Sequence, residues 1–242
     1  YSKLERTLTT LFQAFPRSLP YAGHALRSQL GEKLWVLDRI ARQLGVERDS
    51  VVPGDHHRSH AASAYFTTPY EDAAVLTVDG VGEWTTTALH HGQAGQLRHL
   101  ASSFFPHSLG LLYAAITAFL GFEVNEGEYK VMGLAAFGKA LFRDEFAKLM
   151  RLLPDGAFEL TPHYFASFLN PKLSFAKPLE GLLGPPRAFG RPWELEKEAD
   201  QRYANIAATL QAVTEEALVG LARQARTRTQ ASALCLAGGV AL

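Results

Sequence analysis

The feature that most constrains the fold is a run of three strand patterns joined by glycine turns. An apolar run at 73–79 ends on Asp79 and is followed by a Gly-Val-Gly turn. Further strand-like runs at 84–89 and 96–101 are separated by a second turn that also carries glycines. Short strands joined in this way favour a three-stranded antiparallel meander.

Helical patterns surround this meander. The clearest one runs over 200–226, where the apolar residues from Tyr203 to Leu221 keep to one face. Apolar spacing also predicts helices at 29–44, 56–66, 109–120 and 141–152. Short strands are expected at Val51-Val52 and 233–237, and the weakly periodic, Pro- and Gly-rich stretch 153–192 predicts an irregular insertion or lid. The mixture indicates an α/β protein.

Two histidines form a candidate metal site. His56 and His60 are four residues apart, so a helix places both on one face. Asp79 ends its strand beside turn glycines that leave room for an ion. Two imidazoles and a carboxylate suit Fe(II), Mn(II) or Zn(II). The alternatives are a chance histidine pair on a surface helix and an aspartate that only caps a turn. His57 falls on another helix face and is not expected to be a ligand.

Glycines and one lysine are candidates for binding a nucleotide or a phosphate. Successive N–H groups around Gly80 and Gly82 could form an anion nest. Lys130 lies in a charged, glycine-bearing stretch and could reach a phosphate or carbamoyl oxygen, or simply lie on the surface. Gly238 and Gly239 follow the last strand, where they could approach a nucleotide or form an ordinary turn. The residues alone assign no catalytic group.

Composition restricts the partners. The chain has 24 basic and 24 acidic residues, so its charge gives no argument for a nucleic-acid partner. It holds no apolar run of the ~18 residues that a membrane helix needs, and no membrane partner is expected. Cys235 is the single cysteine and no internal disulfide can form, which fits a reducing, cytoplasmic location. This cysteine is expected to be buried and structural.

Five sequence blocks, in order, resemble the carbamoyltransferase family typified by NodU and CmcH. They are HHRSHAASAYFTTPY at 56–70, VLTVDGVGEWTTT at 75–87, FPHSLGLLYAAITAFLGF at 105–122, EGEYKVMGLAAFG at 126–138 and LCLAGGVAL at 234–242. The resemblance implies an ASKHA-type, actin-like ATPase fold with two ribonuclease-H-like halves. Residues 1–232 would form the first half of the N-terminal Kae-like domain, with an insertion at about 140–200, and residues 233–242 would begin the second.

The resemblance also implies roles for particular residues. His56 and His60 match the family's metal-binding HxxxH motif, and Asp79 matches a carboxylate that reaches the metal. Gly238 and Gly239 match a glycine turn that approaches the nucleotide. The family's Gly-His-Asp strand, a further aspartate ligand and a C-terminal YrdC-like domain have no counterpart in these 242 residues. We therefore expect a chain truncated at both ends, with a site that is incomplete for catalysis.

The family's chemistry sets the expected substrates. Carbamoyl phosphate and ATP give carbamoyl-adenylate at the YrdC-like domain, and the Kae-like domain passes the carbamoyl group to a hydroxyl of an antibiotic, a sugar or a Nod-factor-like acceptor. The implied cofactor is a divalent metal ion, iron first, with manganese and zinc as alternatives. Two other functions stay open on this fold, namely a tRNA threonylcarbamoyl-type transferase and a non-catalytic nucleotide-binding module.

Overall fold

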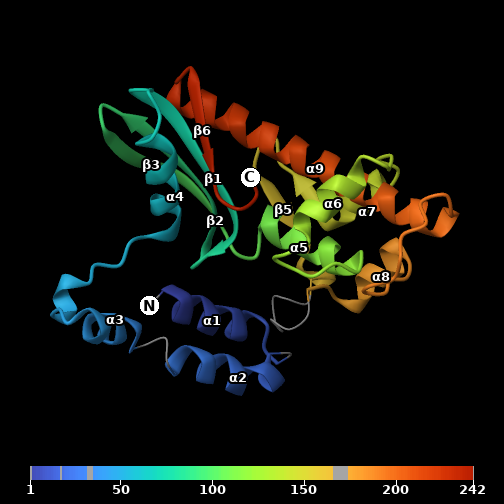
Figure 1. Ribbon diagram of the computed structural model, residues 1–242, viewed down its shortest axis with the longest axis horizontal. Coiled ribbons are helices and arrows are strands. Elements are labelled where there is room, and N and C mark those ends of the chain that lie inside the picture. The colour runs from blue at the N-terminus through green and yellow to red at the C-terminus, as the bar shows by residue number, and fades with distance from the viewer. Residues whose placement is uncertain (1, 17, 32–34, 166–173, 242) are drawn as a thin grey trace.

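The centre of the fold is one mixed sheet. The computed structural model describes residues 2–16, 18–31, 35–165 and 174–241. The sheet has the order β3-β2-β1-β6 and is built from β1 (Asp72–Gly82), β2 (Thr85–Gln93), β3 (Gln96–Phe104) and β6 (Ala233–Ala237) (Figure 1). Strands β1, β2 and β3 pair antiparallel, whereas β6 pairs parallel with β1. The predicted meander and the α/β class are confirmed.

One face of the sheet is covered by helix α4 (His56–Tyr65). Successive side chains of a strand point to opposite faces, and Val75 of β1 points towards α4. There it packs in one apolar cluster with Ala61 and Tyr65. The buried residues of α4 are spaced four apart, as a helix lying flat on a sheet requires. The predicted helix over 56–66 is therefore confirmed.

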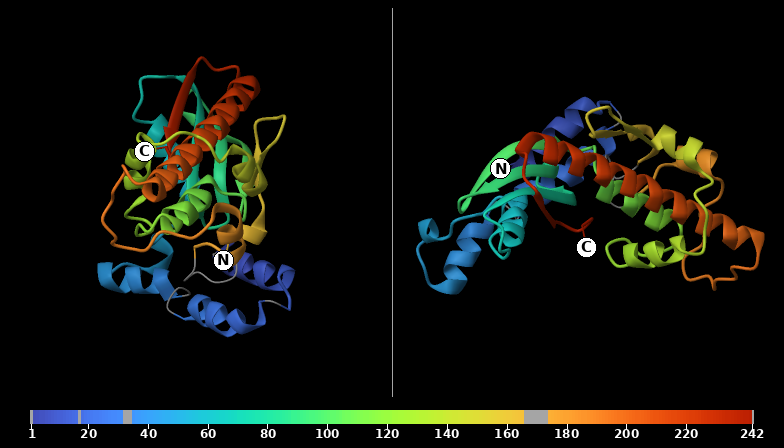
Figure 2. Two further views of the ribbon diagram at one scale, coloured as in Figure 1. Left: turned by 90° about the vertical axis from the view of Figure 1, so that its right-hand side faces the viewer. Right: turned by 90° about the horizontal axis from the view of Figure 1, so that it is seen from above.

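The opposite face carries the main core. Leu76 of β1 is buried there in a cluster shared with helices α5 (Leu109–Phe119) and α9 (Glu198–Thr229). Viewed from above, α9 runs along this side as one long helix (Figure 2). Its apolar face from Tyr203 to Leu221 is buried, as the sequence predicts. Both helices are confirmed, and burial of this face explains why α9 persists over so many turns.

Smaller elements extend this core. They are α6 (Glu128–Ala135), α7 (Arg143–Leu149), α8 (Lys177–Leu183), the 3-10 turns at Arg48–Ser50 and Pro162–Tyr164, and a hairpin of β4 (Met150–Leu152) and β5 (Phe158–Leu160). The predicted helix over 141–152 is wrong at its end, because 150–152 gain a strand partner. The stretch 153–192 is less irregular than predicted; its residues 166–173 lie outside the described chain.

The N-terminal helices depart furthest from the sequence prediction. A single helix over 29–44 is wrong: α2 (Leu19–Leu30) ends where Gly31 follows, and α3 (Val36–Leu44) is a separate helix. With α1 (Ser2–Gln13) they form the blue group below the sheet in Figure 1, and α1 contacts the β1–β2 turn, where Arg6 donates to the Glu83 carbonyl. The predicted strand at Val51-Val52 is also wrong, since Val51 caps a 3-10 turn and neither residue lies in a strand.

Strand β6 belongs to the same sheet as β1. Its residues Ala233–Ala237 pair in register with Ala73–Thr77. The expected strand at 233–237 is confirmed, and the division of the chain at residue 232 stays a prediction. The pairing brings the Gly238–Gly239 turn to the end of β1, next to Asp79. Among the described helices, none has the length and apolarity needed to cross a bilayer.

Candidate metal centre

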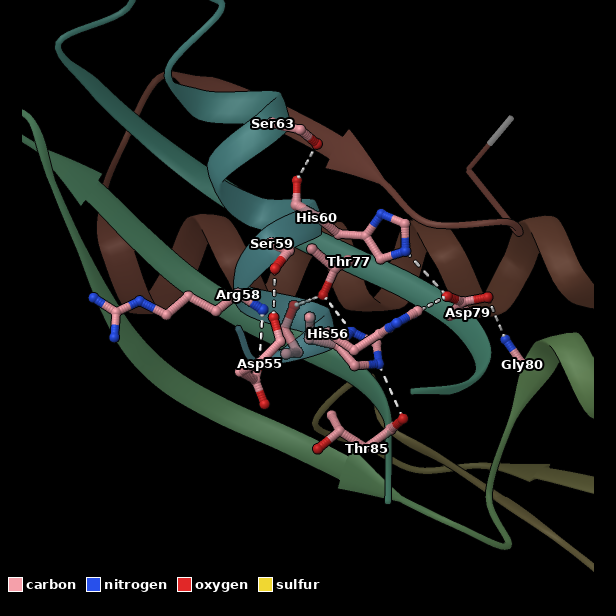
Figure 3. A network of polar contacts seen from close by, with 12 residues as sticks. Asp55, His56, Arg58, Ser59, His60, Ser63, Thr77, Asp79, Gly80 and Thr85 are labelled. Carbon is pink, nitrogen blue, oxygen red and sulfur yellow. Dashed lines mark hydrogen bonds and ion pairs between the residues drawn. The ribbon is translucent and has the colours of Figure 1, made fainter. Parts of the chain in front are cut away.

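Helix α4 begins at the site. Asp55 caps it, because its Oδ1 accepts a hydrogen bond from the backbone N–H of Arg58 at 2.7 Å. His56 is the first helical residue and His60 follows one turn later. The face of α4 that carries Ala61 packs against the sheet. The imidazoles of His56 and His60 therefore lie beside the sheet, near the end of β1 (Figure 3).

Asp79 lies where regular pairing of β1 with β2 is interrupted. The register runs to Val78 and resumes only at Gly82, so Asp79 sits in a bulge. Its Oδ2 lies 2.7 Å from Nε2 of His56 and 3.2 Å from Nε2 of His60 (Figure 3). Its Oδ1 accepts the N–H of Gly80 at 2.8 Å. The structure therefore brings the three predicted ligands together, although Asp79 is 23 residues from His56 in sequence.

The electrostatics keep the carboxylate charged. Burial alone would raise the pKa of Asp79, but the hydrogen bonds from His56 and from the Gly80 N–H, together with the nearby imidazoles, outweigh it. The pKa of Asp79 is consequently lowered from its usual value. An ionised oxygen facing two imidazoles is the form that a cation binds.

The donor set fits a divalent ion. The ligand atoms of His56, His60 and Asp79 all lie within 4.8 Å of one another, the one such group found among the described residues. Metal–ligand bonds of about 2.0–2.2 Å place two ligand atoms at most about 4.4 Å apart. The distances of 2.7 and 3.2 Å from the two imidazoles to Asp79 lie within this limit, and the partly exposed side chains of His56 and His60 have room to adjust around an ion.

His57 occupies a different position. It is buried, with Nδ1 at 2.7 Å from the Thr77 hydroxyl and Nε2 at 2.9 Å from the Thr85 carbonyl. Desolvation lowers the pKa of His57 and favours the neutral ring. The sequence predicts that His57 is not a metal ligand, because it lies on a different face of the helix from His56 and His60. In the structure both of its ring nitrogens have protein partners.

Four predicted glycines lie around the carboxylate. Gly80 donates to it, and a Cβ at Gly82 would lie 2.2 Å from Cδ2 of the His56 ring. A Cβ at Gly239 would lie 3.2 Å from Oδ1 of Asp79, while Gly238 has φ +98° and packs on the Val78 carbonyl. Only glycine adopts such a φ at low cost. Binding of a nucleotide by these residues stays a prediction.

A hollow of about 500 Å³ opens beside the site. Its lining residues come from α4, from the end of β1 and from the turn after β6; they are His60, Ser63, Ala64, Asp79, Leu236, Ala237, Gly238 and Gly239. Lys130 is absent from this lining: it is exposed on α6, with its ammonium 5.6 Å from the centre of the Tyr129 ring. The structure thus joins every predicted site residue except Lys130.

Comparison with known proteins identifies the family. The family model described as "Carbamoyltransferase N-terminus" matches residues 22–242. The chain belongs to the carbamoyltransferase family. It is similar to the uncharacterized protein sll1178 of Synechocystis sp. (42% identity, covering 98% of this chain and 39% of that protein). It is also similar to nodulation protein NolNO of Sinorhizobium fredii (32% identity, 88% and 29%) and nodulation protein NolO of Bradyrhizobium diazoefficiens (30% identity, 77% and 31%).

This carbamoyltransferase chain therefore spans less than two fifths of the length of these relatives.

One residue that supports the site, Ser108, was not predicted from the sequence. Ser108 caps α5 through Leu111 and donates to the carbonyls of the Asp79–Gly80 bulge. A serine just before an apolar helix signals the cap, but no local pattern reveals the bond to the bulge. Ser63, in the wall of the hollow, is one of the small residues after the histidines that are expected to let a ligand come close.

Proposed function

We propose that this chain is the part of an O-carbamoyltransferase that binds a divalent metal at His56, His60 and Asp79. The observation that carries the proposal is the convergence of both imidazoles on one carboxylate oxygen, in a chain whose family is carbamoyltransferase. Iron is the first choice for the ion, with manganese or zinc as alternatives, since all three accept nitrogen and oxygen ligands.

The proposed fold is an ASKHA-type, actin-like ATPase domain. An antiparallel meander followed by a parallel strand, with helices on both faces, is compatible with a ribonuclease-H-like half. In such a domain the nucleotide would lie beside the ends of β1 and β6. The hollow between α4 and the Gly238–Gly239 turn supports this placement, because it opens at those strand ends next to Asp79.

The proposed reaction uses carbamoyl-adenylate, made from carbamoyl phosphate and ATP at a YrdC-like domain of the full-length protein. The acceptor hydroxyl oxygen forms a bond to the carbamoyl carbon, the bond from that carbon to the phosphate oxygen breaks, and AMP leaves while the hydroxyl proton passes to a base or solvent. A bound divalent ion would supply Lewis-acid and orienting chemistry for phosphate oxygens. The chain's own contribution is to hold the ligand side chains and the two glycine turns in place.

The acceptor is proposed to be a hydroxyl of a small molecule. Two relatives are nodulation proteins, which makes a Nod-factor-like oligosaccharide the first acceptor to test, followed by other sugars and hydroxylated antibiotics. Nucleic acid is a less favoured acceptor, because the chain carries equal numbers of acidic and basic residues.

The test uses the protein at its full natural length. Bound metal is measured by mass spectrometry, and ATP-dependent transfer is followed with labelled carbamoyl phosphate, in the wild type and in His56→Ala, His60→Ala and Asp79→Ala. The matched control is His99→Ala, an exposed histidine of β3 whose Nε2 bonds to the Ser102 hydroxyl and whose ring packs on His90, away from the three proposed ligands. Each site variant is expected to lose most of its metal and at least about 100-fold in transfer, as loss of a metal ligand exceeds the 10–100-fold cost of losing its support.

Survival of both metal and transfer in the three variants would contradict the proposal. Metal binding without transfer to any hydroxyl acceptor would indicate the non-catalytic module instead. Threonylcarbamoyl transfer to tRNA under the same conditions would indicate the tRNA-modifying alternative.

A further inference from the structure

His57 stands out because it lies between the proposed ligands His56 and His60 in the sequence, yet it is buried and is not a proposed metal ligand itself. The whole residue is 2% exposed, whereas the side chains of His56 and His60 are 42% and 33% exposed. A buried imidazole needs partners for both nitrogens, since an unpaired one would cost stability. Both are present in the structure, and they come from two different strands.

The two partners flank the bulge that carries Asp79. Nδ1 lies 2.7 Å from the hydroxyl of Thr77, two residues before Asp79 on β1 and itself fully buried. Nε2 lies 2.9 Å from the carbonyl of Thr85, the first residue of β2. A carbonyl can only accept, so Nε2 carries the proton and Nδ1 of the neutral ring accepts from the Thr77 hydroxyl, whose distance to a second acceptor, the Ala88 carbonyl, is longer at 3.3 Å. One imidazole therefore joins α4 to both sides of the bulge.

This link has little freedom to move. Thr77 and Asp79 are two apart on one strand, so the hydrogen bond to Thr77 fixes α4 relative to the strand position next to the carboxylate. The ring of His57 also packs close to the bulge, because a Cβ at Gly82 would lie 2.9 Å from its Cδ2. A slide or rotation of α4 that carried His56 or His60 away from Asp79 would break both bonds of His57.

We propose that His57 is a positioning residue for the metal centre: it sets the register of α4 against the β1–β2 bulge, and so the distance of both ligand imidazoles from Asp79. This rests on the proposed metal site. It adds to that site a residue that touches neither the ion nor a substrate. The competing view is that His57 contributes only to folding stability.

Co²⁺ is the probe that separates these views, because its affinity and its visible absorption both report the ligands. In the protein at its full natural length, His57→Leu removes both hydrogen bonds and keeps an apolar side chain. We expect its dissociation constant for Co²⁺ to rise about 10- to 100-fold, with an altered absorption band, as for other residues that orient metal ligands. His57→Gln can still donate to Thr85 and is expected to recover most of the affinity.

Tyr65 supplies the matched control. It is buried at the other end of α4, where its hydroxyl donates to the Glu71 carbonyl at 2.9 Å. Tyr65→Leu therefore destabilises the same helix far from Asp79. At equal loss of melting temperature, it is expected to change Co²⁺ affinity less than about threefold, below the range for ligand support.

A second variant decides the matter if His57→Leu does not fold. Thr77→Val keeps the buried volume and removes the hydroxyl that bonds Nδ1; we expect at least about a threefold weaker Co²⁺ affinity. Wild-type affinity in the His57 or Thr77 variants, or an equal loss in Tyr65→Leu, would overturn the positioning role. Failure of the wild type to bind Co²⁺ is a separate result, which would remove the metal site and this inference with it.

Discussion

Gly82→Ala tests the proposed metal centre without replacing any of its three ligands. A Cβ at this position would lie 2.2 Å from Cδ2 and 2.7 Å from Cγ of His56. Carbon atoms in contact lie about 3.5–4.0 Å apart, so the ring must retreat by about 1.3 Å or more. The hydrogen bond from His56 to Asp79 spans 2.7 Å and lengthens only to about 3.2 Å before it is lost. The substitution is therefore expected to remove His56 from the ligand set.

The expected loss concerns metal binding more than folding. The side chain of His56 is 42% exposed, so it can rotate into solvent, but the buried ring of His57, whose Cδ2 would lie 2.9 Å from the new Cβ, must shift as well. The free energy of unfolding without metal should therefore fall by about 1 kcal/mol. Co²⁺ affinity measured by titration calorimetry should fall by at least about 10- to 100-fold. Urea unfolding of the metal-free protein measures the change in the free energy of unfolding.

Gly80→Ala is the matched control, because it lies in the same bulge and a Cβ there meets nothing within 4 Å. It should keep wild-type Co²⁺ affinity. Unchanged affinity in Gly82→Ala would refute the reasoning, since it would mean that His56 either moves without consequence or is not a ligand. An equal loss in Gly80→Ala would show that the bulge tolerates no side chain at all.

Two further predictions concern stability. Burial, helped by the neighbouring His99, lowers the pKa of His90 to about 4; because the unfolded state then binds the proton more readily, stability should fall by about 1–2 kcal/mol from pH 7.5 to 5. His90→Gln should flatten that dependence in urea unfolding at the two pH values, and an unchanged slope would contradict the assignment. Asp200 is fully buried beside Arg187 and Arg191, at 3.7 and 3.4 Å. Asp200→Asn should lower the free energy of unfolding by about 3 kcal/mol, as removal of one partner of a buried pair does; a loss below 1 kcal/mol would be inconsistent with that.

Local sequence patterns correctly predicted the helices and strands that are regular over their whole length and bury a single face. The meander, α4, α5 and α9 follow from periodicity and glycine turns, because each buries one face of a regular element. The predictions that fail concern segments whose secondary structure depends on contacts with other parts of the chain. Residues 150–152 continue a helical pattern, yet they pair with β5. Within 29–44, α2 ends at Leu30 and α3 begins at Val36, with 32–34 outside the described residues.

The candidate site shows the same division. Sequence by itself determined that His56 and His60 share a helix face and that Asp79 ends a strand, because spacing and period are local properties of the chain. It also suggested Lys130, which lies exposed on α6, outside the lining of the hollow. Whether a charged side chain reaches a site depends on where its helix or strand packs, and a local sequence pattern does not predict that position.

Only the tertiary structure placed Asp79 within hydrogen-bonding distance of both histidines. It also showed that His57 and Ser108 hold the bulge from opposite sides, one from α4 and one from the start of α5. These contacts join segments 20 and 29 residues apart. They depend on the packing of helices against both faces of one sheet, so they exist only once the core has formed.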